Sequence, residues 1–248
     1  MSDSKVYRDG NKLVKIYLSA PYDYVELAYR RQKFVYDAGL PIPAVYGIKK
    51  ISETETAIEM EYVEGQPLYK LFEDKGDEYQ EDELRVMVKL QCQMNAIDAS
   101  SLPDITDMYI HEITTTPYLT NDMKETLLAY MKSLDKGKTN LCHGDIHPAN
   151  IMVNGGKSWI IDWEDAGKGD PAADACMSYF YAKRWERNDN QRGDLYLRLF
   201  CAESGIPPEE VLAWLPVIAG VQINIEDEND RLFIESHVNE WYKNYVKP

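Results

Sequence analysis

The chain has 248 residues, of which 44% are hydrophobic and 11% aromatic, as is typical of a globular protein. Its formal net charge of −15 argues against nucleic acid or an anionic membrane as a partner, and it is compatible with a cationic small molecule. The sequence has no apolar run of membrane-spanning length, no segment resembling a signal peptide and no paired cysteines among its four, so we expect packed thiols and a cytoplasmic location.

The first residues predict a β-hairpin. Residues 5–7 and 13–17 have strand composition, and an Asp-Gly pair lies in the turn between them. Because side chains alternate along a strand, Lys15 shares one face of the second strand with Leu13 and Tyr17. A lysine in this position is either a solvent-facing edge residue or a ligand for nucleotide phosphate, and the strand pattern leaves both readings open.

A helix and two further strands complete this β-rich first third. The helix is predicted for residues 23–38, because Gly39 is a typical C-terminal cap. Glu26 is either the partner of the strand lysine or an ordinary acid near the positive end of the helix dipole. The strands are predicted for residues 45–50 and 56–63.

The remainder of the chain is predicted to be mainly helical. Apolar spacing and turn signals place helices over 81–99, 120–134, 171–182, 190–204, 209–225 and 227–245. Thr120 or Asn121 is expected to cap the second of them, and Pro216 is expected to kink the fifth. The acidic run 226–230 is either a solvated helix start or part of a cleft for a cationic substrate.

The segment 141–165, LCHGDIHPANIMVNGGKSWIIDWED, carries the most specific chemical pattern. Asp145 and Asn150 lie five residues apart in a loop rich in turn formers. An Asn-Gly pair between two apolar runs then predicts a hairpin that brings Asp162 beside Asn150. Mg²⁺ prefers oxygen ligands of this kind, and a carboxylate such as Asp145 can orient an acceptor hydroxyl and take its proton.

The same residues match a known spacing. The order His-Gly-Asp, four residues, Asn, then Asp-Trp-Glu has the Asp-to-Asn spacing of the protein-kinase catalytic loop, although Gly144 replaces its arginine and the glycine of Asp-Phe-Gly is absent. HGDIHPAN followed by IIDWEDAGKGDPAADA resembles the aminoglycoside phosphotransferase and choline kinase superfamily of small-molecule kinases. The resemblance is strongest over residues 141–175 and extends more weakly over most of the chain.

The resemblance implies a fold. We expect an α+β, bilobal protein-kinase-like architecture, with a small β-rich N-terminal nucleotide-binding lobe over residues 1–63. A larger, mainly helical lobe for catalysis and acceptor binding would cover residues 64–248. Such folds cover the phosphates with a glycine-bearing loop, but residues 1–4 contain no glycine, so either a first strand is missing or a serine-rich turn replaces that loop.

The resemblance also implies roles for particular residues. Lys15 would hold the α- and β-phosphates, with Glu26 as a loose match for its helix partner, since the family position falls nearer Ala28. Backbone groups of Glu61 and Val63 would meet the adenine edge in an inter-lobe hinge.

Asn150 and Asp162 would bind Mg²⁺, and Asp145 would act as the catalytic residue. Asp174 would pin the catalytic loop, and His143 would anchor it, since neither His143 nor His147 has the spaced ligand set of a zinc site.

These implications predict an ATP-dependent phosphotransferase for the hydroxyl of a small molecule, with an aminoglycoside as the default acceptor. Choline, homoserine and sugars are alternative acceptors in the same fold. A catalytically idle nucleotide-binding protein is the alternative from another class, and an atypical protein kinase is disfavoured because no Ala-Pro-Glu motif occurs. The sequence does not fix the acceptor, the choice between ATP and GTP, or the oligomeric state.

Overall fold

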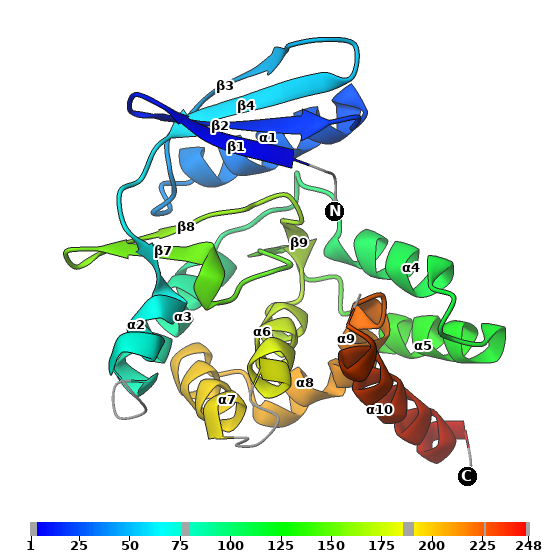
Figure 1. Ribbon diagram of the computed structural model, residues 1–248. Helices are drawn as coiled ribbons and strands as arrows, with labels where there is room; N and C mark the ends of the chain where they lie inside the picture. Colours follow the sequence, from blue (N-terminus) through cyan, green and yellow to red (C-terminus); the bar gives the residue numbers. More distant parts are fainter. Residues whose placement is uncertain (1–3, 76–79, 186–190, 226, 247–248) are drawn as a thin grey trace. The chain divides into compact units, whose positions relative to one another are not determined.

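The structure, a computed structural model, describes residues 4–75, 80–185, 191–225 and 227–246 (Figure 1). It contains two compact units. One comprises Met1–Tyr79 with His147–Ala166, and the other comprises Gln80–Ile146 with Gly167–Pro248. The first unit therefore includes a hairpin that lies far along the chain. The expected division into lobes at residues 63 and 64 stays a prediction.

The first unit contains a four-stranded antiparallel sheet with the strand order β1-β2-β4-β3. Its strands are β1 (Ser4–Asp9), β2 (Lys12–Leu18), β3 (Val45–Lys50) and β4 (Glu55–Glu61). The first hairpin is confirmed, although its two turn residues are Gly10 and Asn11, one position later than the Asp-Gly pair. Gly10 has φ +61°, which favours glycine at this position of a tight turn. Of the segment expected to carry a phosphate-covering turn, only Ser4 lies within the described residues, where it begins β1.

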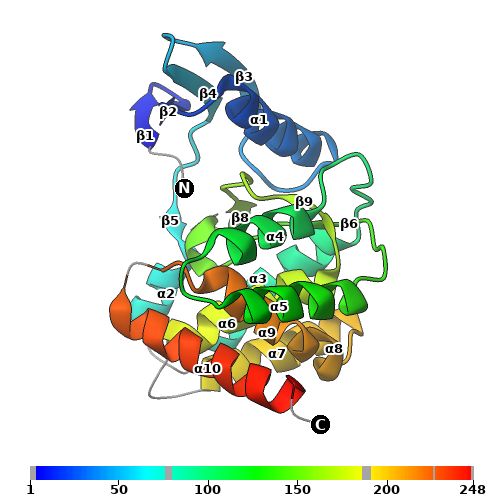
Figure 2. The ribbon, with the colours of Figure 1, turned by 90° about the vertical axis from the view of Figure 1, so that its right-hand side faces the viewer.

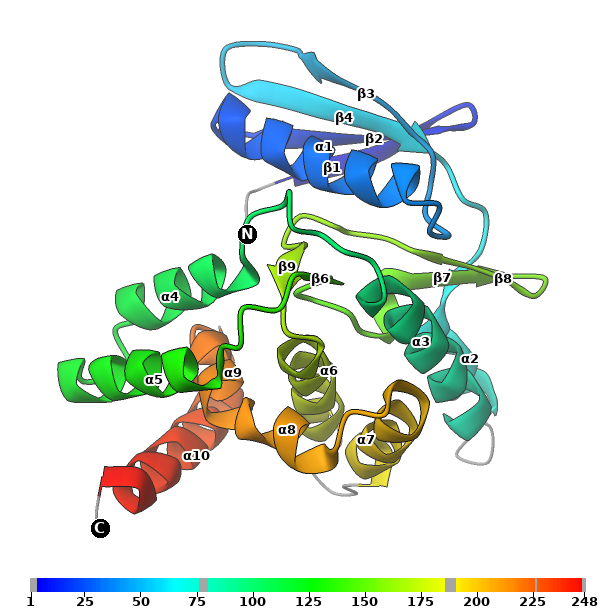
Figure 3. The same cartoon turned by 180° about the vertical axis from the view of Figure 1, so that it is seen from behind.

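The helix α1 (Tyr22–Asp37) lies across one face of this sheet (Figure 3). It follows the predicted range closely and ends before Gly39, whose φ of +80° fits a C-terminal glycine. The core between helix and sheet is built from Tyr17, Val25, Ala28, Ile58 and Met60. Burial of these apolar side chains holds β2 and α1 in fixed positions, and β2 carries Lys15.

A second, three-stranded sheet with the order β5-β7-β8 belongs to the same unit. It consists of β5 (Gln66–Pro67), β7 (Ile151–Asn154) and β8 (Lys157–Ile160), and the unit also contains α2 (Leu68–Lys75) and the 3₁₀ turn η2 (Pro148–Asn150). The second predicted hairpin is thereby confirmed. Its turn residues Gly155 and Gly156 both have positive φ, as the favoured two-residue turn requires.

The second unit is mainly helical (Figure 2). Its described helices are α3 (Gln80–Asn95), α4 (Ile105–Thr115), α5 (Asn121–Leu134), α6 (Pro171–Trp185), α7 (Gln191–Ser204), α8 (Pro208–Ala213), α9 (Leu215–Gln222) and α10 (Glu228–Val246). The short strands β6 (Asn140–Cys142) and β9 (Gly167–Gly169) pair antiparallel within it. The first ten residues of α6 are all buried, and α6 packs against α7, α8 and α9, so it is the central helix of this unit.

Several helix predictions differ from the structure. The single kinked helix over 209–225 is wrong, because the chain forms α8 and α9 with a break at Trp214, and proline in the first turn of α9 starts that helix. The helix predicted to reach residue 99 ends at Asn95, and α4 was not predicted. Thr120 is confirmed as the cap of α5, since its hydroxyl accepts the Met123 N–H at 3.3 Å.

None of the described helices is long and apolar enough to cross a membrane. All four cysteines are free thiols in the structure, and Cys142 and Cys176 are buried. Burial raises the pKa of both buried thiols, so they serve packing rather than nucleophilic chemistry.

Gly65 provides a test of how the chain passes from β4 into β5. A Cβ atom at this position would lie 2.6 Å from the carbonyl oxygen of Val153 in β7. We expect Gly65→Ala to lower the free energy of unfolding by about 1–3 kcal/mol, because backbone must move to admit the methyl group. Urea denaturation measures this change. Gly47→Ala is the matched control, since its Cβ would meet nothing within 4 Å, and a loss as large as that of Gly65→Ala would contradict the close approach.

Candidate functional site

The β7–β8 hairpin places Asn150 and Asp162 side by side at its open end. Ile151 pairs with Ile160, and the Ile161 N–H donates to the Asn150 carbonyl oxygen at 2.9 Å. Asp162 then adopts φ +66°, a left-handed conformation that aspartate tolerates better than most residues. Such backbone strain is common at functional sites and turns the chain sharply after the strand. The structure thus brings together the two residues that the sequence predicts as metal ligands.

Lys15 reaches this end of the hairpin from β2. Its Nζ lies 3.0 Å from Asp162 Oδ1 and also forms an ion pair with the Glu164 carboxylate. The Lys15 side chain is only 17% exposed, so solvent screens these pairs less than it screens surface pairs. Burial alone would lower the pKa of Lys15, but the two carboxylates outweigh it and raise the pKa, which keeps the amine charged.

Glu164 is a site residue that the sequence interpretation missed. The Tyr17 hydroxyl donates to Glu164 Oε1 at 2.6 Å, and the Tyr24 hydroxyl donates to Oε2 at 3.2 Å. The Arg31 guanidinium donates to the Glu164 backbone carbonyl. Burial, and then the Glu164 carboxylate, raises the pKa of Tyr17, so its hydroxyl stays protonated as a donor. The sequence feature that could have indicated this role is the position of Glu164, an acid two residues after the predicted metal ligand Asp162.

Glu26 does not pair with Lys15 in this structure, which corrects the expected partnership. Its carboxylate forms an ion pair with Arg30 one helical turn later, at 3.1 Å. Ala28, at the position where the family glutamate was expected, is buried in the core of the unit and cannot pair with a lysine. The physical reason is that Arg30 on the same helix engages the Glu26 carboxylate, and Lys15 takes its second carboxylate from Glu164. A nucleotide-binding role for Glu26 stays a prediction.

The two expected hinge residues lie at the end of β4. The Glu61 N–H donates to the Ala44 carbonyl oxygen at 2.8 Å, and the Glu61 carboxylate accepts the Ala44 N–H at 3.1 Å. The Glu61 N–H therefore already donates to a protein acceptor. Of the backbone groups of Glu61, the carbonyl oxygen is the remaining candidate for a contact with adenine. Val63 follows outside the strand, and its role stays a prediction.

His147 organises the turn that carries Asn150. Its Nδ1 accepts the Ala149 N–H at 3.2 Å, which supports the 3₁₀ turn η2. The Asn150 amide nitrogen lies 3.3 Å from His147 Nε2, and the Asn150 side chain is buried. The ring therefore restricts the orientation of the amide.

Asp145 belongs to the helical unit, where His143 and a residue of α6 contact its loop. The Asp145 N–H donates to Nδ1 of the fully buried His143 at 3.3 Å, which agrees with an anchoring role for this histidine. The Tyr181 hydroxyl of α6 donates to Asp145 Oδ1 at 2.6 Å. The carboxylate is thus placed by contacts to both its backbone and its side chain.

Asp174 of α6 fixes the turn before Asp145. Its Oδ1 accepts the Gly144 N–H at 2.9 Å, and its Oδ2 accepts from the amides of Gln91 at 3.1 Å and Asn95 at 3.5 Å. Gly144 has φ +81°, so this turn favours glycine. Burial raises the pKa of Asp174, and the hydrogen bonds from these donors oppose that rise. The expected pinning of the loop by Asp174 is confirmed.

The donor chemistry at the end of the hairpin fits a magnesium ion. Asp162 offers a carboxylate that is 45% exposed, and Asn150 offers an amide. Magnesium is usually held by one or two protein carboxylates, with water and substrate phosphates completing its shell. Among the residues that the structure describes, no group of three or more His, Cys, Asp or Glu side chains could hold a metal, so the zinc alternative finds no cluster there.

The acidic run before α10 is engaged in local contacts where it is described. The Asp227 carboxylate accepts the Asp230 N–H at 2.9 Å, as a helix cap does, and Asp230 lies 3.4 Å from Arg184. Glu228 lies 3.8 Å from Arg231. These contacts engage Asp227, Glu228 and Asp230 in helix capping and ion pairs, which favours a helix start over a lining for a cationic substrate.

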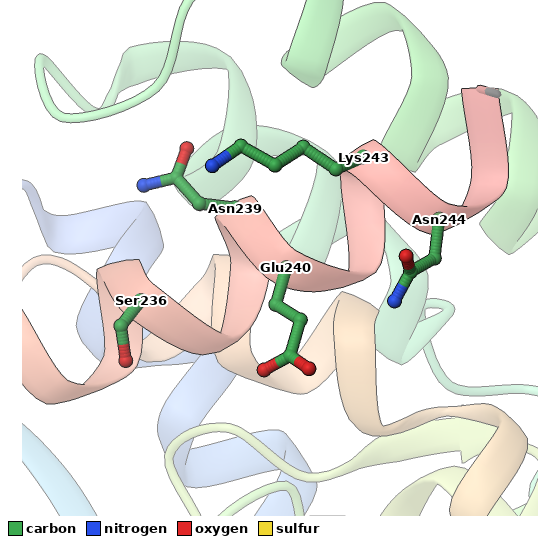
Figure 4. Close-up of a pocket in the computed structure, with 5 residues that line it drawn as sticks. All are labelled: Ser236, Asn239, Glu240, Lys243 and Asn244. Carbon is green, nitrogen blue, oxygen red and sulfur yellow. The ribbon is translucent and has the colours of Figure 1, made fainter.

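A shallow pocket on α10 lacks comparable chemistry (Figure 4). It is lined by Ser236, Asn239, Glu240, Lys243 and Asn244, which recur at helical spacing on one polar face. A solvated helix surface accounts for this composition. We therefore do not assign a functional site to this surface.

Comparison with known proteins identifies the family. The family model described as the phosphotransferase enzyme family matches residues 1–213. The chain belongs to this family. A search of curated proteins gave no match.

Solved structures of phosphotransferases share its fold. A thermostable mutant of the aminoglycoside phosphotransferase APH(4)-Ia, in complex with ADP and hygromycin B, is 17% identical, with 100% of this chain and 95% of that chain covered and a TM-score of 0.66. APH(3'')-Id from Streptomyces rimosus, in complex with ADP and streptomycin, is 17% identical over 87% of this chain and 89% of that chain, with a TM-score of 0.67. The α+β kinase-like fold and the superfamily resemblance are thereby confirmed.

The network around Asp174 predicts a large effect of a small change in this phosphotransferase. Asp174→Asn keeps the side-chain size but places an NH₂ group among the donors of Gly144, Gln91 and Asn95. We expect the free energy of unfolding to fall by roughly 1–3 kcal/mol for a polar group left unsatisfied, measured by urea denaturation. Asp107→Asn, at an exposed position in α4, is the control and should change stability by less than about 0.5 kcal/mol. Equal effects of the two variants would contradict the role of Asp174.

Proposed function

We propose that this phosphotransferase transfers the γ-phosphoryl group of ATP, bound with Mg²⁺, to a hydroxyl group of a small molecule. The observation that carries the proposal is the meeting of Lys15 with Asp162 at 3.0 Å, next to Asn150 at the end of the hairpin. A partly buried cation beside oxygen ligands suits the phosphates of a metal-bound nucleotide. Phosphoryl transfer depends mainly on such positioning and charge neutralisation.

Lys15 would bind the α- and β-phosphates. Its charge is secured by the two carboxylates, and Glu164 would keep the amine oriented once Asp162 turns to the metal. Asn150 and Asp162 would hold Mg²⁺, which when bound neutralises charge on the phosphates. Glu61, Val63 and Glu26 stay candidates for nucleotide contacts.

Asp145 would align the acceptor hydroxyl and accept its proton. It precedes Asn150 by five residues, so the chain links the acceptor residue directly to the turn that carries a metal ligand. The contacts from His143 and Tyr181 hold this carboxylate in place. A fixed carboxylate favours reaction because its orientation need not be restored at each turnover.

The acceptor class is proposed from the similar structures and from the charge of the chain. The similar structures hold hygromycin B and streptomycin, and the net charge of −15 suits a cationic ligand, so an aminoglycoside is the default acceptor. Choline, homoserine and sugars are the alternatives within the same fold, because a fold does not determine its substrate. We propose a cytoplasmic location on the basis of the unpaired thiols.

Asp145→Ala tests the acceptor role. Turnover, followed as ADP release with hygromycin B, streptomycin, choline, homoserine and glucose as acceptors, should be lost, because no group remains to align the hydroxyl. Binding of Mg·ATP, measured by thermal shift, should stay near that of the unaltered protein. Turnover that survives the change would show that another residue serves the acceptor. Absence of any thermal shift with nucleotide in the unaltered protein would contradict nucleotide binding altogether.

Asp162→Ala tests the metal role. The unaltered protein should bind ATP more tightly with Mg²⁺ than with EDTA, as measured by isothermal titration calorimetry. The variant should lose most of this difference, because the carboxylate that would hold the metal is absent, whereas metal-free binding should change little. Mg²⁺ dependence equal to that of the unaltered protein would show that Asp162 is not a ligand.

A further inference from the structure

One face of α6 holds three successive residues of the loop around Asp145. Asp174, Ser178 and Tyr181 are spaced at i, i+4 and i+7, so their side chains lie on the same side of the helix. Asp174 accepts the Gly144 N–H at 2.9 Å, the Ser178 hydroxyl donates to the Ile146 carbonyl at 2.8 Å, and Tyr181 donates to Asp145. The first two contacts fix the backbone on either side of Asp145, and the third reaches its side chain.

The contact from Tyr181 has the geometry of a strong hydrogen bond. Its hydroxyl oxygen lies 2.6 Å from Asp145 Oδ1, within the range of O–H···O⁻ bonds to a carboxylate. The tyrosine is partly buried, and its ring is bordered by the Arg184 guanidinium at 5.8 Å from the ring centre. Arg184 is in turn paired with Asp230 of α10 at 3.4 Å. The Arg184–Asp230 ion pair therefore packs against the Tyr181 ring and helps to hold its hydroxyl beside Asp145.

We propose that Tyr181 is a positioning residue for phosphoryl transfer, which sets the plane of the Asp145 carboxylate so that it can receive the acceptor hydroxyl. An aspartate carboxylate rotates broadly about its last bond, and backbone contacts do not restrain that rotation. A hydroxyl bound to Oδ1 does restrain it. Each carboxylate oxygen accepts more than one hydrogen bond, so this contact leaves acceptor capacity for a substrate.

This inference rests on the proposed function of Asp145, and it makes a more specific claim. A purely structural tyrosine would affect stability and every kinetic constant through misfolding. A positioning residue affects the transfer step, because misplacement of a reacting group raises the barrier after binding has taken place. The division of the effect between kcat and the KM for ATP therefore separates the two roles.

The test compares Tyr181→Phe with Tyr179→Phe and Asp145→Asn. Tyr179 belongs to the same helix, and its ring faces Lys183 at 5.5 Å, so removal of its hydroxyl controls for loss of a tyrosine OH from α6. Turnover is measured as ADP release with the most active of hygromycin B, streptomycin, choline, homoserine and glucose, or with water as acceptor if none is turned over. Mg·ATP binding is measured by thermal shift.

We expect Tyr181→Phe to lower kcat roughly 10- to 100-fold, with an unchanged KM for ATP and an unchanged thermal shift. Tyr179→Phe should keep the unaltered kcat. If Asp145→Asn is inactive but Tyr181→Phe is fully active, the positioning role is overturned and the proposed function stands. If Asp145→Asn is fully active, the acceptor role of Asp145 fails and the positioning role of Tyr181 fails with it. The proposed function itself fails only if the unaltered protein shows no thermal shift with Mg·ATP and no turnover.

A double-mutant cycle that measures melting temperature tests whether the side chains of Tyr181 and Asp145 interact, even if no turnover is found. Asp145→Ala and Tyr181→Phe should give melting-temperature changes that are non-additive in the double variant, because each removes the same hydrogen bond. Additive changes would show that the two side chains do not interact, which would overturn the proposal.

Discussion

The ion pairs of Lys15 are the interaction on which the nucleotide part of the site depends. A lysine from the second strand meets two carboxylates from a turn that lies 147 and 149 positions later in the chain. The strand is fixed by the apolar core beneath α1, and the turn is fixed by the hairpin that precedes it. Without these carboxylates, burial would lower the pKa of the Lys15 amine and so weaken the charge that binds phosphate. The charge needed for phosphate binding is thus built into the folding of this unit.

The helical unit meets a different requirement, that of orientation. The loop around Asp145 is short, contains Gly144 with positive φ, and forms no helix or strand that would hold its conformation. α6 supplies that structure through contacts to the backbone and to the carboxylate. The charge at Lys15 and the orientation of Asp145 are therefore secured by separate local frameworks, and the short segment from Asp145 to Asn150 connects them along the chain.

The features predicted from the sequence are those that depend on neighbouring residues along the chain, such as turns and hairpins. The hairpin that joins Asn150 to Asp162 follows from a turn signal between two apolar runs, and the structure contains it. Contacts between distant segments were not predictable in this way. The partner of Lys15 is Glu164 because the helix position where a glutamate was expected is an alanine in the core, and no local pattern reveals this exchange. The contact of Tyr181 with Asp145 likewise depends on how α6 packs under the loop. The break at Trp214 was missed because apolar spacing continued across it.

The most direct test of the account is a structure of the protein with Mg²⁺ and the ATP analogue AMP-PNP. We expect the metal to be bound by oxygen atoms of Asn150 and Asp162 at about 2.0–2.1 Å. The Lys15 amine should contact phosphate oxygens while it keeps its pair with Glu164. A nucleotide bound elsewhere, or a metal without either residue in its shell, would contradict the assignment of this site.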